Sequence, residues 1–430
     1  LGFFYTIHME IQELYQLFQA NPIIDTDSRT IRKKSIFFAL KGENFNANLF
    51  AEDALKNGAS FAVVDEDLYP LNLNIILVDN VLETLQKLAN FHRNQLNIPI
   101  ISLTGSNGKT TTKELINAVL TTKFKTIATK GNLNNHIGVP LTLLSITKDT
   151  EIAIVEMGAN HQKEIEFLCS IAEPNYGYIT NFGKAHLEGF GGVEGVIKGK
   201  SELYDFLRKT NGLAFINFDD DIQFEKSLGI KTVSFDVNSD FIELIAANPF
   251  VKIRFNDIEI QSQLIGNYNV NNIAAAITIG LFFKVPENDI KKAIENYIPT
   301  NNRSQLMKIG TNIIFMDAYN ANPSSMKVAL ENFSQVEGNS KIVILGDMFE
   351  LGEDSLKEHQ AIADLVSGFN FKQIHLIGAH FSTVKTNNVF QYKDFVQFKN
   401  KFESGNFQKA TILIKGSRGM ALERVLDLLK

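Results

Sequence analysis

Residues 104–111, TGSNGKTT, have the side chains and glycines that hold phosphate groups. They follow the apolar residues 100–103 and precede a helical pattern in which apolar residues of 115–120 share one face. Glycines let backbone N–H groups approach phosphates, the helix N-terminus adds partial positive charge, Lys109 adds a full charge and Thr110 can bind Mg²⁺. The usual string G-x-x-x-x-G-K-[ST] is not satisfied, because a leucine replaces its first glycine. The order of strand, loop and helix still predicts nucleotide binding, with an ordinary strand-to-helix turn as the alternative.

Three ionisable residues follow within about a hundred positions. Glu156 ends an apolar run, where a carboxylate needs a partner because an uncompensated buried charge is costly. His186 follows another apolar run, and Lys200 shares a helical face with the apolar residues of 203–207. Each has an ordinary interpretation. Glu156 could form a salt bridge, His186 could lie on the surface, and Lys200 could bury its aliphatic chain while its ammonium group reaches solvent. Together, downstream of a phosphate loop, they predict a site for Mg²⁺ and a γ-phosphate.

The elements that position these residues are short apolar runs ending in Gly, Asn or Asp, each followed by helical periodicity. Such runs are typical of buried parallel strands in α/β proteins. Ligands then bind at the carboxyl ends of the strands, where the unusual residues lie. The runs are IPIISLTG, EIAIVEMG, YGYITNFG, NIIFMDAY, KIVILGDM, QIHLIGAH and ATILIKGS.

Length and composition limit the possible classes of protein. The 430 residues predict about three domains, which we place at 1–97, 98–298 and 299–430. A net charge of −6 argues against a broad nucleic-acid surface, and the single cysteine cannot form an internal disulfide. No apolar run approaches the roughly 18 residues of a membrane helix.

The first residues give no targeting signal. The segment 1–18 has no basic leader and no small-residue cleavage site, so we expect no signal peptide and a cytoplasmic location. An amphipathic helical pattern begins at Met9, and we interpret residues 1–8 as an upstream extension.

A set of ten motifs resembles the Mur ligases and appears in the order found in that family. The resemblance covers nearly the whole chain and includes the DSR string at 27–29. It implies three domains: a UDP-sugar domain, a central P-loop-type ATPase domain with a mostly parallel sheet, and a Rossmann-like C-terminal domain for the amino substrate. The motifs are TGSNGKTTTKE, GNLNNHIGVPLTLL, VEMGANHQKEI, NFGKAHLEGFG, KGKSELY, GNYNVNNIAAA, NNRSQ, DAYNANPSSM, ILGDMFELGE and KGSRGMALE.

The resemblance also implies an ATP site with Mg²⁺. The ATP phosphates would be held by Gly105, Ser106, Asn107, Gly108, Lys109, Thr110 and Thr111. Glu156, His186 and Thr110 would bind Mg²⁺, together with Lys200 as a carbamate, an anion that can ligate metal. Asn272 would contact adenine, Arg303 the phosphates and Asp317 the ribose. Tyr268 departs from the family pattern, because many relatives have His there.

The DAYNANP and GDMFELGE strings are similar to members of the family that add D-alanyl-D-alanine. The implied reaction joins that dipeptide to UDP-N-acetylmuramoyl-tripeptide through an acyl phosphate, as the last cytoplasmic step of the peptidoglycan precursor. Ser28 and Arg29 would bind the uridine diphosphate, and Asn134 and Asn135 would face the muramoyl-peptide, with simple turn chemistry as their alternative. We expect a monomer that does not bind nucleic acid and does not insert into a membrane.

Two other functions stay open at this point. The chain could be another Mur-type ligase or one resembling folylpolyglutamate synthetase. It could also be a catalytically silent nucleotide-binding partner, although the presence of Glu156, His186 and Lys200 argues against that.

Overall fold

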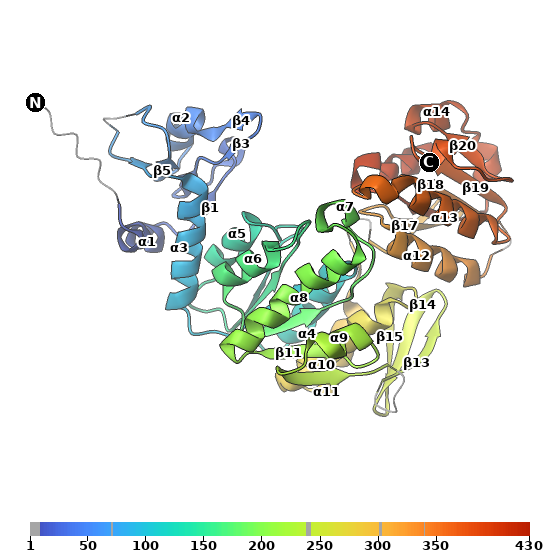
Figure 1. Cartoon of the computed structure of the whole chain (residues 1–430), viewed down its shortest axis with the longest axis horizontal. Coiled ribbons are helices and arrows are strands. Elements are labelled where there is room, and N and C mark those ends of the chain that lie inside the picture. Colours follow the sequence, from blue (N-terminus) through green and yellow to red (C-terminus); the bar gives the residue numbers. More distant parts are fainter. Residues whose placement is uncertain (1–8, 70–71, 238–241, 301–302, 339) are drawn as a thin grey trace, which may run out of the picture. The chain divides into compact units, whose positions relative to one another are not determined.

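The computed structural model describes residues 9–69, 72–237, 242–300, 303–338 and 340–430; the predicted extension, residues 1–8, lies outside them. Helices and strands alternate along most of the chain (Figure 1), which confirms the predicted α/β class. The described residues divide into two compact units, while the predicted domain boundaries near 97 and 299 stay predictions. The first unit contains the chain up to 102 with 124–158 and 164–176, and the second contains 103–123, 159–163 and 177–430.

The N-terminal part of the first unit is a small parallel sheet with strand order β1-β2-β5-β6. Its core is apolar and rich in alanine, with Phe37 and Val64 packed against alanines of 47–59. Helix α1 follows the amphipathic pattern that begins at Met9, and it buries Leu14 and Phe18. The elements are α1 (Ile11–Ala20), β1 (Ile24–Asp25), β2 (Ile36–Phe38), the antiparallel pair β3 (Lys41–Gly42) and β4 (Phe45–Asn46), α2 (Ala51–Lys56), β5 (Phe61–Val64), β6 (Ile75–Leu77) and α3 (Val81–Gln95).

A six-stranded sheet with order β12-β11-β10-β7-β9-β8 carries the phosphate loop. Every residue of β7 and β9 is buried, which explains their continuous apolar sequences. The pairs β8–β9 and β11–β12 are parallel. The elements are β7 (Ile100–Thr104), α4 (Lys109–Thr121), β8 (Thr126–Ala128), α5 (Gly138–Leu144), β9 (Ile152–Glu156), α6 (Glu164–Ala172), β10 (Tyr176–Ile179), α7 (Leu187–Phe190), α8 (Val193–Thr210), β11 (Leu213–Asn217), α9 (Asp221–Lys226) and β12 (Lys231–Phe235).

A three-stranded antiparallel sheet, β13-β14-β15, follows in the second unit. Its strands are β13 (Ile242–Ala247), β14 (Phe250–Phe255) and β15 (Ile258–Ile265), and α11 (Glu287–Asn296) packs against β15. Burial largely alternates along β15, as expected for a sheet with one solvated face. No strand of this sheet is among the apolar runs predicted from the sequence. Helix α10 (Asn269–Phe282) begins just after it.

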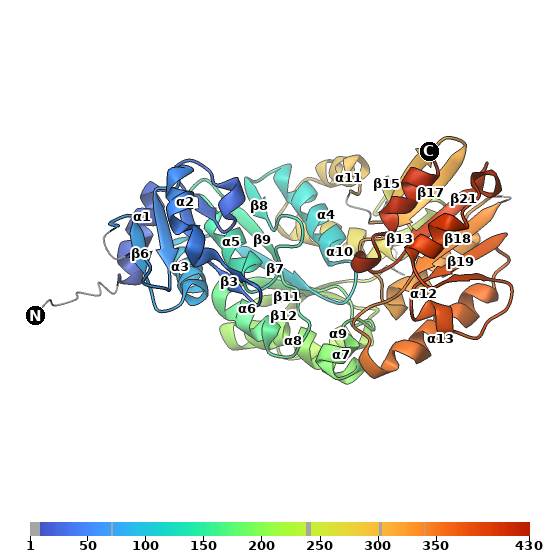
Figure 2. The ribbon, with the colours of Figure 1, turned by 90° about the horizontal axis from the view of Figure 1, so that it is seen from above.

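The C-terminal part is a second six-stranded sheet, of order β16-β17-β21-β18-β19-β20. The pair β16–β17 is antiparallel and the other pairs are parallel, so the predicted mostly parallel character is confirmed. Helices α12 and α13 lie along one face (Figure 2). The elements are β16 (Gln305–Ile309), β17 (Asn312–Asp317), α12 (Pro323–Gln335), β18 (Lys341–Gly346), α13 (Ser355–Ser367), β19 (Gln373–Ile377), β20 (Phe390–Tyr392), α14 (Phe395–Asn400), β21 (Thr411–Lys415) and α15 (Val425–Leu428).

Candidate functional site

The phosphate loop joins β7 to α4, as the sequence predicts. Gly105 has φ 140°, and a Cβ there would lie 2.0 Å from Thr180 Oγ1. Gly108 has φ 81°, and a Cβ there would lie 2.7 Å from Asn272 Oδ1. Both positions therefore require glycine, for conformation and for space. The lack of side chains at these two positions lets the backbone of the loop pack closely against Thr180 and Asn272. It also lets backbone N–H groups approach phosphates, as a phosphate-binding loop requires.

The residues that follow β10 hold this loop in place. Asn107 N donates to Asn181 Oδ1 (3.1 Å), and Asn107 O accepts from Thr180 Oγ1 (2.6 Å) and Asn181 Nδ2 (3.0 Å). Ser106 Oγ donates to the Gly183 carbonyl at 2.7 Å. The segment 180–183 thus fixes the loop through contacts between side chains and main-chain atoms, which preorganises the loop before a ligand binds.

Lys109 and Asn272 complete this half of the site. Lys109 Nζ donates to the carbonyl oxygens of Gly105 (2.6 Å) and Ser106 (3.3 Å), so the ammonium group stays over the loop. Asn272, from α10, accepts a hydrogen bond from Thr112 Oγ1 (2.9 Å) and donates to Asn269 Oδ1 (2.8 Å). The structure therefore places the predicted adenine contact directly beside Gly108.

Glu156 and Asn134 lie together in the first unit. Glu156 is the last residue of β9 and is 1% exposed. Asn134 Nδ2 donates to Glu156 Oε1 at 2.8 Å, and Thr129 Oγ1 accepts from the Glu156 amide at 2.9 Å. The neighbouring Asn135 Oδ1 accepts from the backbone of Ile137 and Gly138 just before α5. The contact between Asn134 and Glu156 links a predicted substrate residue to a predicted metal ligand.

Lys200 lies on the buried face of α8, as its spacing predicts. It is fully buried, and so are Leu203, Tyr204 and Leu207. Its Nζ donates to the Ala159 carbonyl at 3.1 Å and lies 4.9 Å from the centre of the Phe190 ring. A fully buried lysine normally has either a partner of opposite charge or an amine that is neutral or chemically modified.

His186 forms an ion pair that the sequence did not predict. Its Nδ1 contacts Glu350 Oε2, a residue of the GDMFELGE motif in the C-terminal part. The hydrogen bond from His186 lowers the pKa of the Glu350 carboxyl. His186 also has φ 53°, a left-handed conformation that is unusual for a residue with a side chain and is frequent at functional sites.

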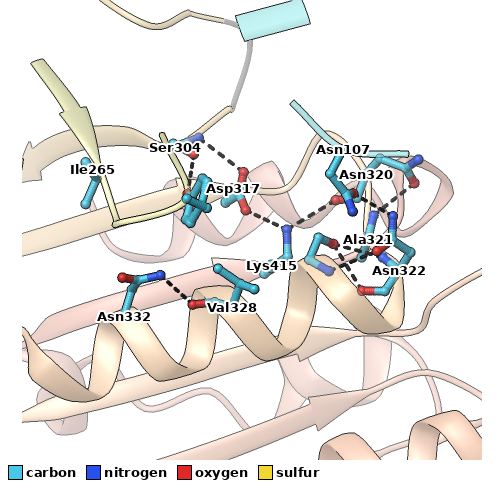
Figure 3. A network of polar contacts seen from close by, with 12 residues as sticks. Asn107, Ile265, Ser304, Asp317, Asn320, Ala321, Asn322, Val328, Asn332 and Lys415 are labelled. Atoms are coloured by element: carbon cyan, nitrogen blue, oxygen red, sulfur yellow. Dashed lines mark hydrogen bonds and ion pairs between the residues drawn. The ribbon is translucent and has the colours of Figure 1, made fainter. Parts of the chain in front are cut away.

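Asp317 and Lys415 form a second unpredicted ion pair, at the carboxyl ends of β17 and β21. The two residues face each other in the parallel register, and Lys415 Nζ lies 2.5 Å from Asp317 Oδ2 (Figure 3). The other oxygen, Oδ1, accepts from the Ser304 amide at 3.1 Å. Asp317 is therefore fixed by two contacts, with its side chain 21% exposed.

Tyr268, the departure from the family pattern, belongs to the same network. Its hydroxyl lies 2.6 Å from Ser304 Oγ, and burial raises its pKa. A small, mostly apolar cavity of about 30 Å³ lies beside it, and Asp317 and Phe333 are among the lining residues. Tyr268 thus connects the start of α10 with the segment that precedes β16.

Arg303 stacks on an aromatic ring. Its guanidinium carbon lies 3.6 Å from the centre of the Tyr319 ring, in the DAYNANP motif. Such stacking orients a guanidinium group while leaving its N–H groups at the edge of the plane.

Asn322 joins the C-terminal part to the phosphate loop. Its Nδ2 donates to Asn107 Oδ1 at 2.7 Å (Figure 3), and its Oδ1 accepts from the Ser325 amide at 2.9 Å, which caps α12. Asn322 lies in the DAYNANP motif, but the sequence alone predicted no role for it. Its one signal was a proline in the next position, which is typical of the first helical residue.

Ser28 and Arg29 lie in a short 3₁₀ turn, Ser28–Thr30, of the N-terminal part. Arg29 forms a two-point ion pair with Asp27, which lowers the pKa of the Asp27 carboxyl to about 2. The Arg29 side chain is 86% exposed. A cation fixed by one carboxylate and open to solvent still has N–H groups for an anionic ligand.

Among the residues that the structure describes, no three His, Cys, Asp or Glu side chains gather as a metal cluster. Within the same part of the chain, no helix is both long enough and apolar enough to span a bilayer.

Family models match most of the chain in two segments. The Mur ligase middle domain matches residues 103–280, and the Mur ligase glutamate ligase domain matches residues 302–418. UDP-N-acetylmuramoyl-tripeptide–D-alanyl-D-alanine ligase of Bacillus subtilis is 33% identical over 94% of this chain and 92% of its own length. The chain belongs to the Mur ligase family. The predicted resemblance is confirmed.

Solved Mur ligase structures share the fold. MurF from Acinetobacter baumannii is 30% identical with a TM-score of 0.85, covering 96% of this chain and 97% of its own. MurF from Thermotoga maritima, solved in complex with ADP, is 26% identical with a TM-score of 0.82, covering 95% of this chain and 97% of its own. The three-domain Mur ligase architecture predicted from the motifs is thereby supported along the full length.

Proposed function

We propose that this chain joins D-alanyl-D-alanine to UDP-N-acetylmuramoyl-tripeptide, with hydrolysis of ATP to ADP and phosphate. The product is the pentapeptide precursor of peptidoglycan, so the activity serves cell-wall synthesis and, through it, cell shape and division. The observation that carries the proposal is the phosphate loop, in which Gly105 and Gly108 leave no room for a Cβ and Lys109 lies over the backbone. Relatives with this activity match the chain over more than nine tenths of its length.

The reaction needs activation because a carboxylate is a poor acyl donor. The terminal carboxylate of the tripeptide attacks the γ-phosphorus of ATP, the bond to the β-phosphate oxygen breaks, and ADP leaves. The neutral amine of the dipeptide then attacks the acyl carbon of the acyl phosphate. Inorganic phosphate leaves, and the amine loses its extra proton.

Charge repulsion is the main obstacle to the first step. Two unit anions 4 Å apart repel by about 4 kcal/mol at an effective dielectric constant near 20, equivalent to almost three decades in rate. Lys109 supplies a cation at the loop, and Arg303, held flat by Tyr319, supplies another. We assign Ser106, Asn107, Thr110 and Thr111 to the phosphates through the backbone at the start of α4.

We assign the other predicted binding residues to the remaining parts of ATP and of the UDP-linked substrate. Asn272 lies against Gly108 and contacts the adenine, and Asp317, fixed by Lys415 and Ser304, contacts the ribose hydroxyls. Ser28 and Arg29 hold the uridine diphosphate, where Arg29 offers an exposed guanidinium group. Asn134 and Asn135 face the muramoyl-peptide.

The oxygen donors fit Mg²⁺. Glu156 gives a buried carboxylate and Thr110 a hydroxyl that is 6% exposed. Mg²⁺ normally takes one or two protein carboxylates together with substrate phosphates, so no cage of three acidic residues is needed. When bound, Mg²⁺ neutralises phosphate charge. His186 and a carbamate on Lys200 complete the proposed ligand set.

A carbamate forms when the neutral Lys200 amine adds to CO₂ and a proton is released. It replaces a cation in an apolar face by an anion that can accept hydrogen bonds and bind metal. The full burial of Lys200 supports this assignment, because a buried ammonium group is costly.

The substrates also favour a cytoplasmic location and a monomer. ATP and a UDP-linked precursor are cytoplasmic metabolites, and a single chain carries both the loop and the C-terminal sheet.

An amine panel tests the proposed specificity. With ATP and UDP-N-acetylmuramoyl-tripeptide present, D-Ala-D-Ala, diaminopimelate, lysine and glutamate are supplied one at a time, and the products are identified by mass. We expect a product only with D-Ala-D-Ala. A product with another amine of the panel instead would assign the chain to a different ligase of this class.

A further inference from the structure

A chain of hydrogen bonds joins the start of α10 to the carboxyl end of β17. The Tyr268 hydroxyl lies 2.6 Å from Ser304 Oγ, and the Ser304 amide donates to Asp317 Oδ1 at 3.1 Å. Figure 3 shows Ser304 beside Asp317, whose other oxygen pairs with Lys415 of β21. The carboxylate that we assign to the ribose is therefore held from two sides, by Lys415 and by a turn that Tyr268 contacts.

Ser304, the middle of this chain, has an unusual backbone conformation. Its φ is 47°, in the left-handed region that residues with a side chain rarely adopt. Gln305 pairs with Met316 in the antiparallel β16–β17 ladder, so Ser304 lies opposite Asp317 just beyond the end of that ladder. Such a conformation persists only where the surrounding contacts determine it. Tyr268 holds the side chain of Ser304 and Asp317 accepts from its amide, so each contact stabilises the other.

The ring of Tyr268 is itself fixed in place. Gly266 has φ 88°, and a Cβ there would lie 2.5 Å from Tyr268 Cε1, so the ring packs directly over the backbone of this glycine. Asn269 Nδ2 donates to the Ile265 carbonyl at 2.7 Å and closes the turn between β15 and α10. The Tyr268 hydroxyl is therefore a fixed point from which Ser304 can be held.

The same turn of α10 carries the residue that we assign to the adenine. Asn272 Nδ2 donates to Asn269 Oδ1 at 2.8 Å, and Asn269 directly follows Tyr268. Tyr268, Ser304 and Asp317 also line the same small cavity, and the Asp317 side chain is 21% exposed, so a ligand hydroxyl can reach it. The first turn of α10 thus connects the proposed contacts of the base and of the sugar.

We propose that Tyr268 is a positioning residue that, through Ser304, fixes the Asp317 carboxylate for the ribose hydroxyls of ATP. The inference rests on the proposed function and names the residue that sets the selectivity for a ribonucleotide. An ionised carboxylate has about four lone-pair sites, so Asp317 can accept from the Ser304 amide, from Lys415 and from ribose hydroxyls at the same time. Without the Tyr268 hydroxyl, the Ser304 turn is free to relax and Asp317 loses one of its two fixed contacts.

Nucleotides that lack one ribose hydroxyl test the inference. Wild-type enzyme, Tyr268→Phe, Ser304→Ala and the double variant are assayed with ATP, 2′-deoxy-ATP and 3′-deoxy-ATP. We expect wild type to prefer ATP by roughly 10- to 100-fold in kcat/KM over at least one analogue, the usual effect of a hydrogen bond to a charged group. Tyr268→Phe should reduce this preference by roughly three- to tenfold, mainly by raising KM for ATP rather than by lowering kcat. Ser304→Ala should act alike, and the double variant should be no worse than either single variant, because both remove the same hydrogen bond.

A matched tyrosine separates the possible failures. Tyr392→Phe removes another buried hydroxyl of the same unit, which lies 3.1 Å from His375 Nδ1, and it should leave the preference for ATP unchanged. Urea unfolding of each variant distinguishes lost selectivity from lost folding. If Tyr268→Phe kept the wild-type preference, or if its effect and that of Ser304→Ala were additive, the inference would be overturned while the proposed function stood. Equal use of the three nucleotides by wild type would overturn the inference together with the ribose contact of Asp317. If wild type formed no product with ATP and both substrates, the proposed function would fail as well.

Discussion

At the scale of single residues, Lys109 dominates the charge of the phosphate loop. Its ammonium group lies over the carbonyl oxygens of Gly105 and Ser106, so it is held where the β- and γ-phosphates of ATP are expected. The Lys109 side chain leaves the first turn of α4, and the fold of the loop itself depends on Thr180 and Asn181. Removing the charge should therefore affect chemistry more than folding.

We expect Lys109→Ala to lower kcat by at least about a thousandfold, since the two reacting anions lose their nearest cation. Binding of UDP-N-acetylmuramoyl-tripeptide should change little, because the residues that we propose for the uridine diphosphate, Ser28 and Arg29, lie in the other compact unit. Phosphate release and calorimetric titration measure the two quantities. ADP release close to the wild-type rate would show that the loop has another role.

Lys200 gives a second prediction at this scale. Lys200→Ala should lose most activity, and a short carboxylic acid such as acetate should restore part of it by replacing the carbamate anion. Lys200→Arg keeps a cation but cannot form the carbamate, so it should stay inactive with or without acetate. Full activity of Lys200→Arg would rule out a carbamate.

The sequence predicted the residues of the loop but missed the ion pairs that fix its surroundings. Gly105, Lys109 and Thr110 lie within six consecutive residues, so their spacing in the sequence alone brings them together. Asp317 and Lys415 are 98 positions apart. Their contact depends on the register of β17 beside β21, and that register is set by tertiary pairing rather than by either segment alone.

At the scale of elements, the N-terminus of α12 connects the C-terminal sheet with the phosphate loop. Asn322 uses its amide oxygen to cap the helix and its amide nitrogen to bind Asn107. The two tasks are separable, because serine is also a good cap but is too short to replace the second contact.

We expect Asn322→Ser to keep the free energy of unfolding within about 1 kcal/mol of wild type and to lower kcat/KM for ATP by roughly two- to tenfold. Steady-state kinetics and urea unfolding measure both effects. Asn80→Ser is the matched control, since Asn80 caps α3 in the same way without any contact to the loop. Equal kinetics for the two variants would contradict the role of Asn322.

The strand β19 carries a buried histidine that makes stability depend on pH. Burial lowers the pKa of His375 from 6.5 to about 4. Below pH 6.5 the unfolded chain binds a proton that the folded chain does not, so stability decreases as the pH falls from 6.5 to 4. The shift corresponds to a loss of about 3 kcal/mol at the lower end.

His375→Phe should remove this contribution, because the ring that stacks on Phe390 and Tyr392 is kept but no longer titrates. Urea unfolding midpoints between pH 4 and 7 should therefore fall less steeply than in wild type. The exposed His136→Gln serves as the control. Parallel pH curves for wild type and His375→Phe would show that another group causes the dependence.

Elements with continuous apolar runs were predictable, and the small antiparallel sheet was not. The predicted run EIAIVEMG became β9, in which every residue is buried. The strands β13, β14 and β15 instead mix charged and apolar residues, as in the ion-paired Arg254 and Glu243. Their pairing depends on contacts with α11 and with each other, which no local pattern encodes.

At the scale of the whole molecule, the charge of −6 says little about the site. The groups that we propose to face phosphates are local: Lys109 and Arg303 in the second unit and Arg29 in the first. The chain forms two compact units that combine segments distant in sequence, and the boundaries near 97 and 299 stay predictions. The family was predicted correctly from the order of the motifs, because motifs can be identified in the sequence without any knowledge of tertiary packing.

The proposed ligase activity can be tested by measuring the release of ADP with each substrate omitted in turn. With ATP, UDP-N-acetylmuramoyl-tripeptide and D-Ala-D-Ala together, we expect continuous ADP release matched by formation of the pentapeptide product. Without the dipeptide, release should stop after about one ADP per enzyme, because the acyl phosphate has no acceptor; without the tripeptide, no ADP should form. ADP release from ATP alone at the rate of the complete mixture would contradict the account.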